Sequence, residues 1–200
     1  MHANKTDQFK LHPLSIVLEI IELYGDDIDF EFSHYTYKRN TIEDNRTTFK
    51  ISAKSITEDF LIDLCDKTPS GNNLAFHSTV YFNNGITKHI PMIDLATRAV
   101  GVISKILNVL PNELANKMIW FESGRSLHGY GTYLITPQSW MHFMGRLLLA
   151  NQPQQHPVVD PRWIGHRLIA GYSALRWTKN TDDYIQIPQL VKNIHLIQQK

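Results

Sequence analysis

The sequence predicts an α+β fold in which a mixed, largely antiparallel sheet is flanked by helices. Three observations favour this class. Residues 28–33 alternate apolar and polar side chains as a half-buried strand does, Asn83–Asn84–Gly85 links two strand-like segments as a tight hairpin, and helical segments fall between the strands. The chain has neither G-x-G-x-x-G nor G-x-x-x-x-G-K-[ST], so it lacks the glycines with which dinucleotide-binding and P-loop folds hold phosphates.

The first third of the chain predicts a helix, a strand pair and a second helix. Pro13 suits a first-turn position and Gly25 supplies a stop for the first helix. Ser55 stands three residues before Glu58, a capping-box spacing that places the start of the second helix at Ser55. The expected elements are a helix over 14–24, antiparallel strands over 28–37 and 47–53, and a helix over 55–65.

The middle of the chain predicts two strand pairs with a helix between them. Pro111 ends the helix, whose apolar residues follow a helical spacing. The small residues Ser123–Gly124–Arg125–Ser126 form a tight connection between the two later strands. The expected elements are strands over 74–82 and 86–95, a helix over 98–110, and strands over 118–123 and 127–135.

The last part predicts one helix and one strand-like stretch. Thr136 and Pro137 are suited to the N-cap and the first turn of a helix that continues to Asn151. Residues 158–178 are rich in β-branched and aromatic side chains, and we expect strand structure there with bends at two glycines, Gly165 and Gly171. We expect one domain over residues 1–200, with its motif-bearing core at about 76–178 and residues 13–75 packed on that core.

Composition limits the classes of function. The 20 basic and 19 acidic residues nearly cancel, so any nucleic-acid contact has to come from a local patch rather than from a basic field over the whole chain. One cysteine, Cys65, cannot form an internal disulfide, and we expect it to be a small buried residue. No run approaches about 18 uninterrupted apolar residues. These features predict a cytoplasmic protein without a membrane contact.

Three segments carry residues suited to phosphate chemistry. Asp94 ends a strand-like run just before a helix, where a carboxylate can hold Mg²⁺ or Mn²⁺ or can simply interact with the helix dipole. Residues 123–128 combine a turn of small residues with Arg125 and His128, which suits an anion site or a plain β-turn. Asp160 is followed by several cationic side chains, which suit a polyanion site or a solvated strand edge. They are Arg162, His166, Arg167 and Arg176.

Together these segments resemble the motif series of archaeo-eukaryotic primases and primase-polymerases, over about residues 76–178. Asp94 with the following LATRAV is similar to the first motif, Ser126–Leu127–His128 is similar to the Ser-x-His second motif, and Val159–Asp160 with the later arginines is similar to the third. The family usually carries a second aspartate two residues after the first, where this chain has Ala96. The sequence therefore resembles a divergent, primase 1D-like member with a single aspartate in the first motif.

The resemblance implies a fold like the primase catalytic core and a metal-dependent nucleotidyl transfer on a nucleic-acid template. Asp94 and Asp160 would bind Mg²⁺ or Mn²⁺ and would form the catalytic group with His128. The partners implied are a nucleoside triphosphate and a single-stranded nucleic acid or template-primer. The expected nucleotide-binding residues are Ser123, Gly124, Arg125, Ser126, Arg167 and Arg176.

Two further hypotheses stay open. Without an acid at Ala96, the domain could hold nucleotide or nucleic acid without polymerising, inside a larger protein complex of a mobile element or a defence system. Asp27, Asp29 and Glu31 share one strand face and compete as metal ligands, although they alternate with apolar residues as a solvent face does. The scattered histidines and the lack of HExxH or paired cysteines argue against a zinc site.

Overall fold

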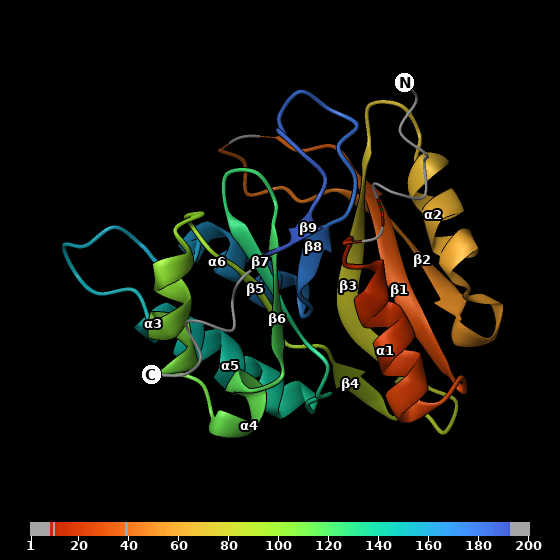
Figure 1. Ribbon diagram of the computed structural model, residues 1–200, viewed down its shortest axis with the longest axis horizontal. Helices are drawn as coiled ribbons and strands as arrows, with labels where there is room; N and C mark the ends of the chain where they lie inside the picture. The colour runs from red at the N-terminus through yellow and green to blue at the C-terminus, as the bar shows by residue number, and fades with distance from the viewer. Residues whose placement is uncertain (1–8, 10, 39, 193–200) are drawn as a thin grey trace.

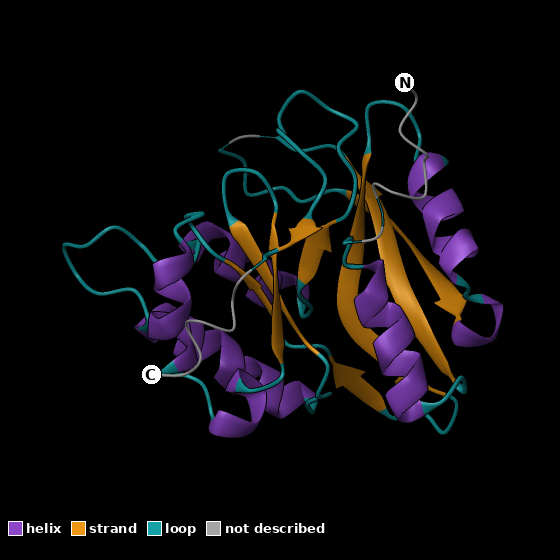
Figure 2. Ribbon diagram, viewed as in Figure 1, coloured by secondary structure: helices purple, strands orange, loops and turns teal. Residues whose placement is uncertain are grey.

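The computed structural model describes residues 9, 11–38 and 40–192, and it has the expected α+β fold of antiparallel sheets flanked by helices. Figure 2 shows the strands in the middle of the molecule with helices on either side. The helices are α1 (Leu14–Tyr24), α2 (Glu58–Asp66), α3 (Ile103–Leu107), α4 (Asn112–Ala115), α5 (Pro137–Leu149) and α6 (Pro161–Ala170). The strands are β1 (Ile28–Tyr35), β2 (Arg46–Ser52), β3 (Asn73–Phe82), β4 (Thr87–His89), β5 (Met92–Asp94), β6 (Met118–Glu122), β7 (Leu127–Gly131), β8 (Ala174–Arg176) and β9 (Gln189–Leu190).

The first sheet has the order β2-β1-β3-β4, and β8 also pairs with β3. All of these pairs are antiparallel. Helices α1 and α2 lie along this sheet (Figure 1), and the apolar side of α1 packs on alternate residues of the strands. Ile16 and Ile20 of α1 meet Phe30, Phe32 and Phe76, all with no exposed surface. Truncating one of these phenylalanines to alanine would cost about 3–5 kcal/mol.

The second sheet has the order β5-β7-β6-β9 and is also antiparallel. Helices α3 to α6 gather beside it (Figure 1), and Trp120 of β6 packs with Phe143 of α5 and Ile164 of α6. Gly129 of β7 is required by this packing, because an added Cβ would lie 2.8 Å from the Trp120 ring. The second core therefore fixes the strands that carry the 123–128 segment.

The hairpin at residues 83–85 is confirmed, but the expected strand 86–95 serves both sheets. Its first part, β4, pairs with β3, and its second part, β5, pairs with β7. Pro91 lies between the two parts, where its carbonyl accepts a hydrogen bond from Gly131 N at 2.8 Å. Because one segment crosses from sheet to sheet, Asp94 is placed at the junction of the two halves.

The strand expected over 158–178 is wrong for most of its length, because residues Pro161–Ala170 form helix α6. Asp160 caps the helix by accepting hydrogen bonds from two backbone amides, Pro161 occupies the first turn, and Gly171 ends it with φ +80°. Gly165 lies inside the helix and is not a bend. The end of the stretch, β8, is a strand as expected.

Two other helix boundaries differ from expectation. The second helix begins at Glu58 with Thr57 as its N-cap, since Thr57 Oγ1 accepts from Phe60 N at 3.1 Å, whereas Ser55 lies in a preceding 3₁₀ turn. The helix expected over 98–110 is reduced to a 3₁₀ turn over Val100–Val102 followed by α3. The remaining helix and strand predictions agree with the structure to within a few residues at their ends.

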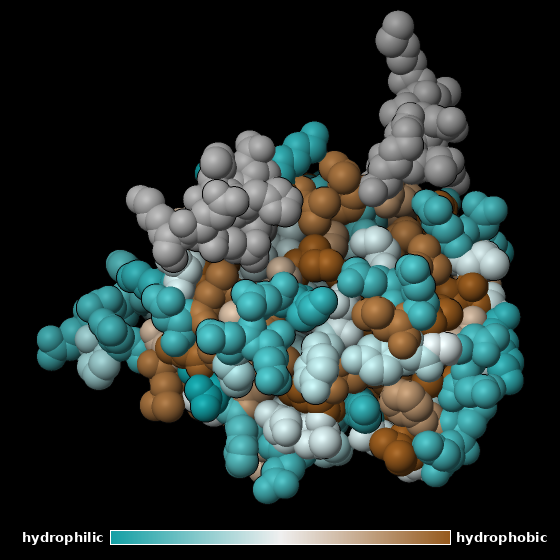
Figure 3. Space-filling view, turned by 60° about the horizontal axis from the view of Figure 1, so that its bottom comes forward, coloured by the Kyte–Doolittle hydropathy of each residue, from teal (hydrophilic) through white to brown (hydrophobic). Residues whose placement is uncertain are grey.

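The visible surface is mixed in hydropathy. On the face shown in Figure 3, apolar residues are interspersed with hydrophilic ones rather than joined in one expanse.

Cys65 is buried, as expected, and this burial, with a smaller contribution from Asp66, raises the pKa of its thiol to about 12. None of the helices in the described part of the chain is long and apolar enough to cross a membrane.

Candidate active site

Three distant segments of the chain meet at Asp94. In the pairing of β5 with β7, Asp94 lies directly opposite His128. On its other side, Asp160 N donates a hydrogen bond to the Asp94 carbonyl at 3.0 Å, and Leu95 forms a bridge with Val159. The second and third predicted motifs therefore lie on either side of the first, although 32 and 66 positions separate them from Asp94 in the sequence.

These residues face a cleft of about 340 Å³, which we call the central cleft. Eight of the nine candidate site residues line it: Asp94, Ser123, Arg125, Ser126, His128, Asp160, Arg167 and Arg176. Its walls also include parts of the chain in which the sequence had indicated no site residue, in particular residues 35–38, several residues between 40 and 46, and residues 183–185. The volume is within the usual range for small-molecule sites.

Asp94 lies at the floor of the central cleft with 23% of its side chain exposed. The Ser126 hydroxyl donates a hydrogen bond to Asp94 Oδ1 at 3.1 Å, which fixes the direction of the carboxylate. Burial, and secondly the nearby charge of Asp160, raises the pKa of Asp94 from its ordinary value of 3.8 to about 7. The charge of Asp160 is thus close enough to disfavour ionisation of Asp94.

His128 presents a neutral imidazole to the same floor. Burial, with a smaller contribution from the Arg176 charge, holds the pKa of His128 well below its ordinary 6.5. His128 Nε2 is 3.7 Å from Asp94 Oδ1, beyond hydrogen-bond range, and Nδ1 is buried without a partner among the described residues. A buried imidazole with unused hydrogen-bonding capacity beside a cleft is costly unless a ligand completes it.

The turn between β6 and β7 is built from its serines. Ser123 N and Ser123 Oγ both donate to the Ser126 carbonyl at 3.0 Å, and the two hydroxyls are 2.9 Å apart. Gly124 has φ +112° and packs against the 185–186 backbone and side chains, where an added Cβ would lie 3.2 Å from Ile185. Gly124 is not among the residues that line the cleft, so its place in the predicted nucleotide-binding group is not supported by the geometry.

Asp160, at the N-terminus of α6, caps the helix and also lines the cleft. Its Oδ1 accepts hydrogen bonds from Arg162 N at 2.8 Å and from Trp163 N at 3.2 Å, which caps the helix. Its other carboxylate oxygen makes no hydrogen bond within the described ranges, so one oxygen remains for a ligand. The helix thereby orients an acidic side chain beside Asp94.

Arg176 lines the wall of the cleft and also contributes positive charge to it. Its guanidinium donates to three backbone carbonyls, those of Ser123 at 2.7 Å, Thr178 at 2.5 Å and Gln186 at 3.1 Å. It also lies 4.0 Å from the centre of the Tyr184 ring. The arginine therefore ties the 123–126 turn to the 178–186 segment, and its charge favours the ionised form of Asp94.

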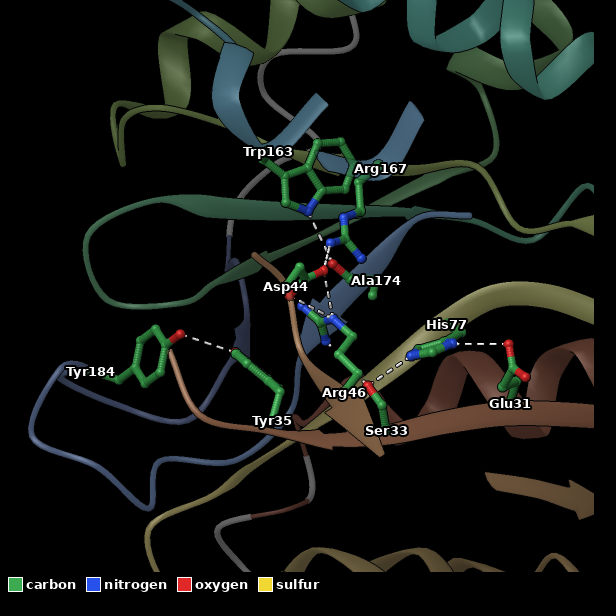
Figure 4. Close-up of polar contacts among 10 residues, drawn as sticks. All are labelled: Glu31, Ser33, Tyr35, Asp44, Arg46, His77, Trp163, Arg167, Ala174 and Tyr184. Atoms are coloured by element: carbon green, nitrogen blue, oxygen red, sulfur yellow. Dashed lines mark hydrogen bonds and ion pairs between the residues drawn. The ribbon is translucent and has the colours of Figure 1, made fainter. Parts of the chain in front are cut away.

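The central cleft is also lined by a polar group of which the sequence indicated only Arg167. Asp44 pairs with both Arg46 and Arg167, and the Tyr35 and Tyr184 hydroxyls are 3.0 Å apart (Figure 4). The sequence showed only a polar turn after β1, because the Asp44–Arg167 and Tyr35–Tyr184 contacts each span more than 100 positions. By contrast, Tyr130 of β7 is fully buried in the core.

The competing acidic strand residues lie elsewhere. Asp27 forms an exposed ion pair with Lys54, and Glu31 pairs with His77 at 3.0 Å. The cleft-lining residues include neither of them, nor Asp29. The choice of Asp94 over this face as the candidate site is therefore consistent with the structure.

Comparison with known protein families gives one match. The family model described as archaeo-eukaryotic primase 1D-like matches residues 52–189, which is more than half of the chain. The chain belongs to this family. No curated protein and no solved structure matches it.

The family assignment agrees with the position of the site. The matched residues contain Asp94, His128 and Asp160, so the three motifs of this primase-like domain all fall inside the match. Asp44 and Arg46 precede it. Ala96, where primases usually carry their second aspartate, donates a backbone hydrogen bond to the Val158 carbonyl at 2.9 Å and so helps to hold the segment before Asp160 beside that of Asp94.

Proposed function

We propose that this primase-like domain binds a nucleoside triphosphate with a divalent cation in the central cleft and transfers the nucleotide to a nucleic-acid strand. The observation that supports this most is the convergence of Asp94, Asp160 and the neutral His128 on one cleft. The arginines that line the same cleft provide positive charge for phosphates.

The acidic pair fits Mg²⁺ or Mn²⁺. Hard cations take carboxylate oxygens, and a site with one or two carboxylates leaves the other positions to water and substrate phosphates. The described residues contain no cluster of three or more His, Cys, Asp or Glu side chains suited to a metal, so the proposed site would have two protein carboxylates, with water and phosphates as the other ligands. When bound, the cation would neutralise charge on the triphosphate.

The other residues position and neutralise the substrate. Ser126 directs the Asp94 carboxylate through its hydroxyl. His128, being uncharged, can donate one N–H to a phosphate oxygen without competing with the cation for the carboxylates. Arg125 and Arg167 line the cleft and would contact phosphates of the nucleotide or of a single-stranded template.

A second candidate function is nucleotide or nucleic-acid binding without transfer. Ala96 supports it, because the lost carboxylate removes a ligand with which related primases would hold a second cation. Such a module would act inside a larger protein complex. The two functions share the same cleft and differ in whether a new phosphodiester forms.

An incorporation assay separates them. The protein is incubated with labelled ribo- or deoxynucleoside triphosphates, a primed single-stranded template and Mn²⁺, beside Asp160→Asn, which retains a helix-capping oxygen but loses the charge. We expect extension by the wild type and a loss of about 100-fold or more in the variant, since a metal ligand contributes several kcal/mol. Asp63→Asn, which removes only an exposed ion pair with Lys67, is the matched control.

Extension by Asp160→Asn at the wild-type rate would exclude the proposed metal site. No extension by the wild type, together with nucleotide binding that weakens as salt rises, would favour the binding module. No salt-sensitive binding would exclude both functions.

A further inference from the structure

One carboxylate lies between two arginines on the wall of the central cleft. Asp44 accepts hydrogen bonds from Arg46 Nε at 2.9 Å and from Arg167 Nη2, and Figure 4 shows it between the two guanidinium groups. All three residues line the cleft. The geometry is that of an anion held by two arginines, with the anion supplied by the protein itself.

Asp44 does not satisfy all of the hydrogen-bond donors of Arg167. Arg167 is 2% exposed, and its Nε and Nη1 are buried without a hydrogen-bond partner in the described structure. Asp44 offers one negative charge to two guanidinium groups. A buried cation with unpaired donors is costly, and an anion with more oxygens than a carboxylate would satisfy more of these N–H groups.

The arginines are fixed more firmly than the aspartate. Arg46 Nη1 donates to Ser33 Oγ at 3.2 Å, Ser33 Oγ is 2.8 Å from His77 Nε2, and His77 Nδ1 is 3.0 Å from Glu31 (Figure 4). This chain runs from the cleft into the first sheet. Arg46 is also 4.3 Å from the centre of the Tyr35 ring.

Asp44, in contrast, belongs to a connection between β1 and β2 whose residues are mostly exposed. Its own side chain is 26% exposed, and its neighbours Glu43 and Asn45 are exposed as well. The tie from this connection to α6, apart from Asp44 itself, is a hydrogen bond from Arg162 Nη2 to the Thr41 carbonyl at 2.9 Å. Moving Asp44 therefore disturbs little of the core, whereas moving either arginine disturbs much more.

We propose that Arg46 and Arg167 form a phosphate-binding subsite and that the Asp44 carboxylate is its internal stand-in, displaced when a phosphate group of the ligand arrives. This inference adds a phosphate subsite to the proposed function. It rests on that function only for the source of the phosphate, which is a nucleotide or a nucleic-acid strand. Asp44 then makes phosphate binding weaker than the two arginines alone would allow.

The test compares two acidic residues of the same wall. Asp44→Asn removes the carboxylate between the arginines, and Glu43→Gln removes the same charge from a neighbouring cleft residue that has no ion pair in the described structure. Binding of inorganic tripolyphosphate, ATP and an oligothymidylate is measured by calorimetry in buffer with a chelator. Without divalent ions the readout does not depend on cation binding by Asp94 and Asp160, so it is separate from the incorporation assay.

We expect Asp44→Asn to tighten binding of at least one of the probes by about tenfold, as the loss of one competing charge-assisted hydrogen bond predicts. Glu43→Gln should change it by no more than about twofold, because an exposed charge is screened. Tightening with tripolyphosphate and ATP alone assigns the subsite to the nucleotide. Tightening with the oligothymidylate alone assigns it to the strand.

Equal changes in the two variants, or weaker binding in Asp44→Asn, would overturn the inference and leave Asp44 as a structural ion pair. Thermal unfolding with and without tripolyphosphate covers the case in which Asp44→Asn loses stability. The anion should then raise the melting temperature of Asp44→Asn more than that of the wild type. Arg46→Gln should abolish the gain when combined with Asp44→Asn, and a double variant that keeps the gain would also contradict the subsite.

Discussion

Asp94 is the residue at which the effects of burial and of the neighbouring charges of this site combine. Its position at the end of an apolar strand was enough to single it out from the sequence, because strand ends present side chains at the edge of a rigid scaffold. The family resemblance also paired it with Asp160, but the sequence could not give the geometry of the pair or its effect on the pKa of Asp94. Asp160 approaches it through a backbone hydrogen bond across 66 positions, and the resulting proximity helps to raise the pKa of Asp94 to about 7.

This shift predicts how stability depends on pH without metal. Because the pKa of Asp94 is higher in the folded state than its ordinary 3.8, the folded state binds more protons between about pH 4 and 7. The free energy of unfolding should therefore fall as pH rises through this window and level off above it. Asp94→Asn should lack this part of the fall, and above pH 7 it should exceed the wild type by at most about 4 kcal/mol.

Urea unfolding from pH 4 to 8 measures both curves, with Asp63→Asn as an exposed control. Parallel curves for the wild type and Asp94→Asn would mean that Asp94 ionises normally. The divalent cation should remove most of the difference at pH 7 and above, since it would stabilise the ionised carboxylate.

At the scale of single elements, most helices and strands follow from local signals. The sequence was sufficient to predict the alternation in β1, the hairpin at residues 83–85 and the Thr136–Pro137 start of α5. The error at α6 is instructive. Aromatic and β-branched residues suggested a strand, yet the sequence also offered the Asp160–Pro161 start and the Gly171 stop of a helix, and those end signals decided the structure.

Asp160 has a structural role at the start of α6 that can be separated from its charge. Asparagine caps helices about as well as aspartate, whereas alanine offers no acceptor. Asp160→Ala should therefore be less stable than Asp160→Asn by about 1 kcal/mol at neutral pH. Denaturant unfolding of the two variants measures the difference, and equal stability would show that the capping hydrogen bonds contribute nothing.

At the scale of the whole molecule, the site depends on the way the chain joins its two sheets. The segment from β4 to β5 crosses between them and places Asp94 at the junction, and α6 returns from the second half to supply Asp160 and Arg167. The order of motifs along the sequence indicated the convergence of Asp94, His128 and Asp160. The walls from residues 35–38, from several residues between 40 and 46, and from residues 183–185 could not be predicted, because their place depends on tertiary contacts without a local signature.

The most direct test of the central claim is Mn²⁺ binding, measured by calorimetry at pH 6 in two buffers with different heats of ionisation. We expect one Mn²⁺ per chain with release of a proton, because Asp94 is largely protonated below its pKa of about 7. Asp94→Asn and Asp160→Asn should each weaken binding by about tenfold or more, while Asp63→Asn should not. Binding of equal strength in all four proteins, or no binding by the wild type, would contradict a divalent-cation site shared by these two aspartates.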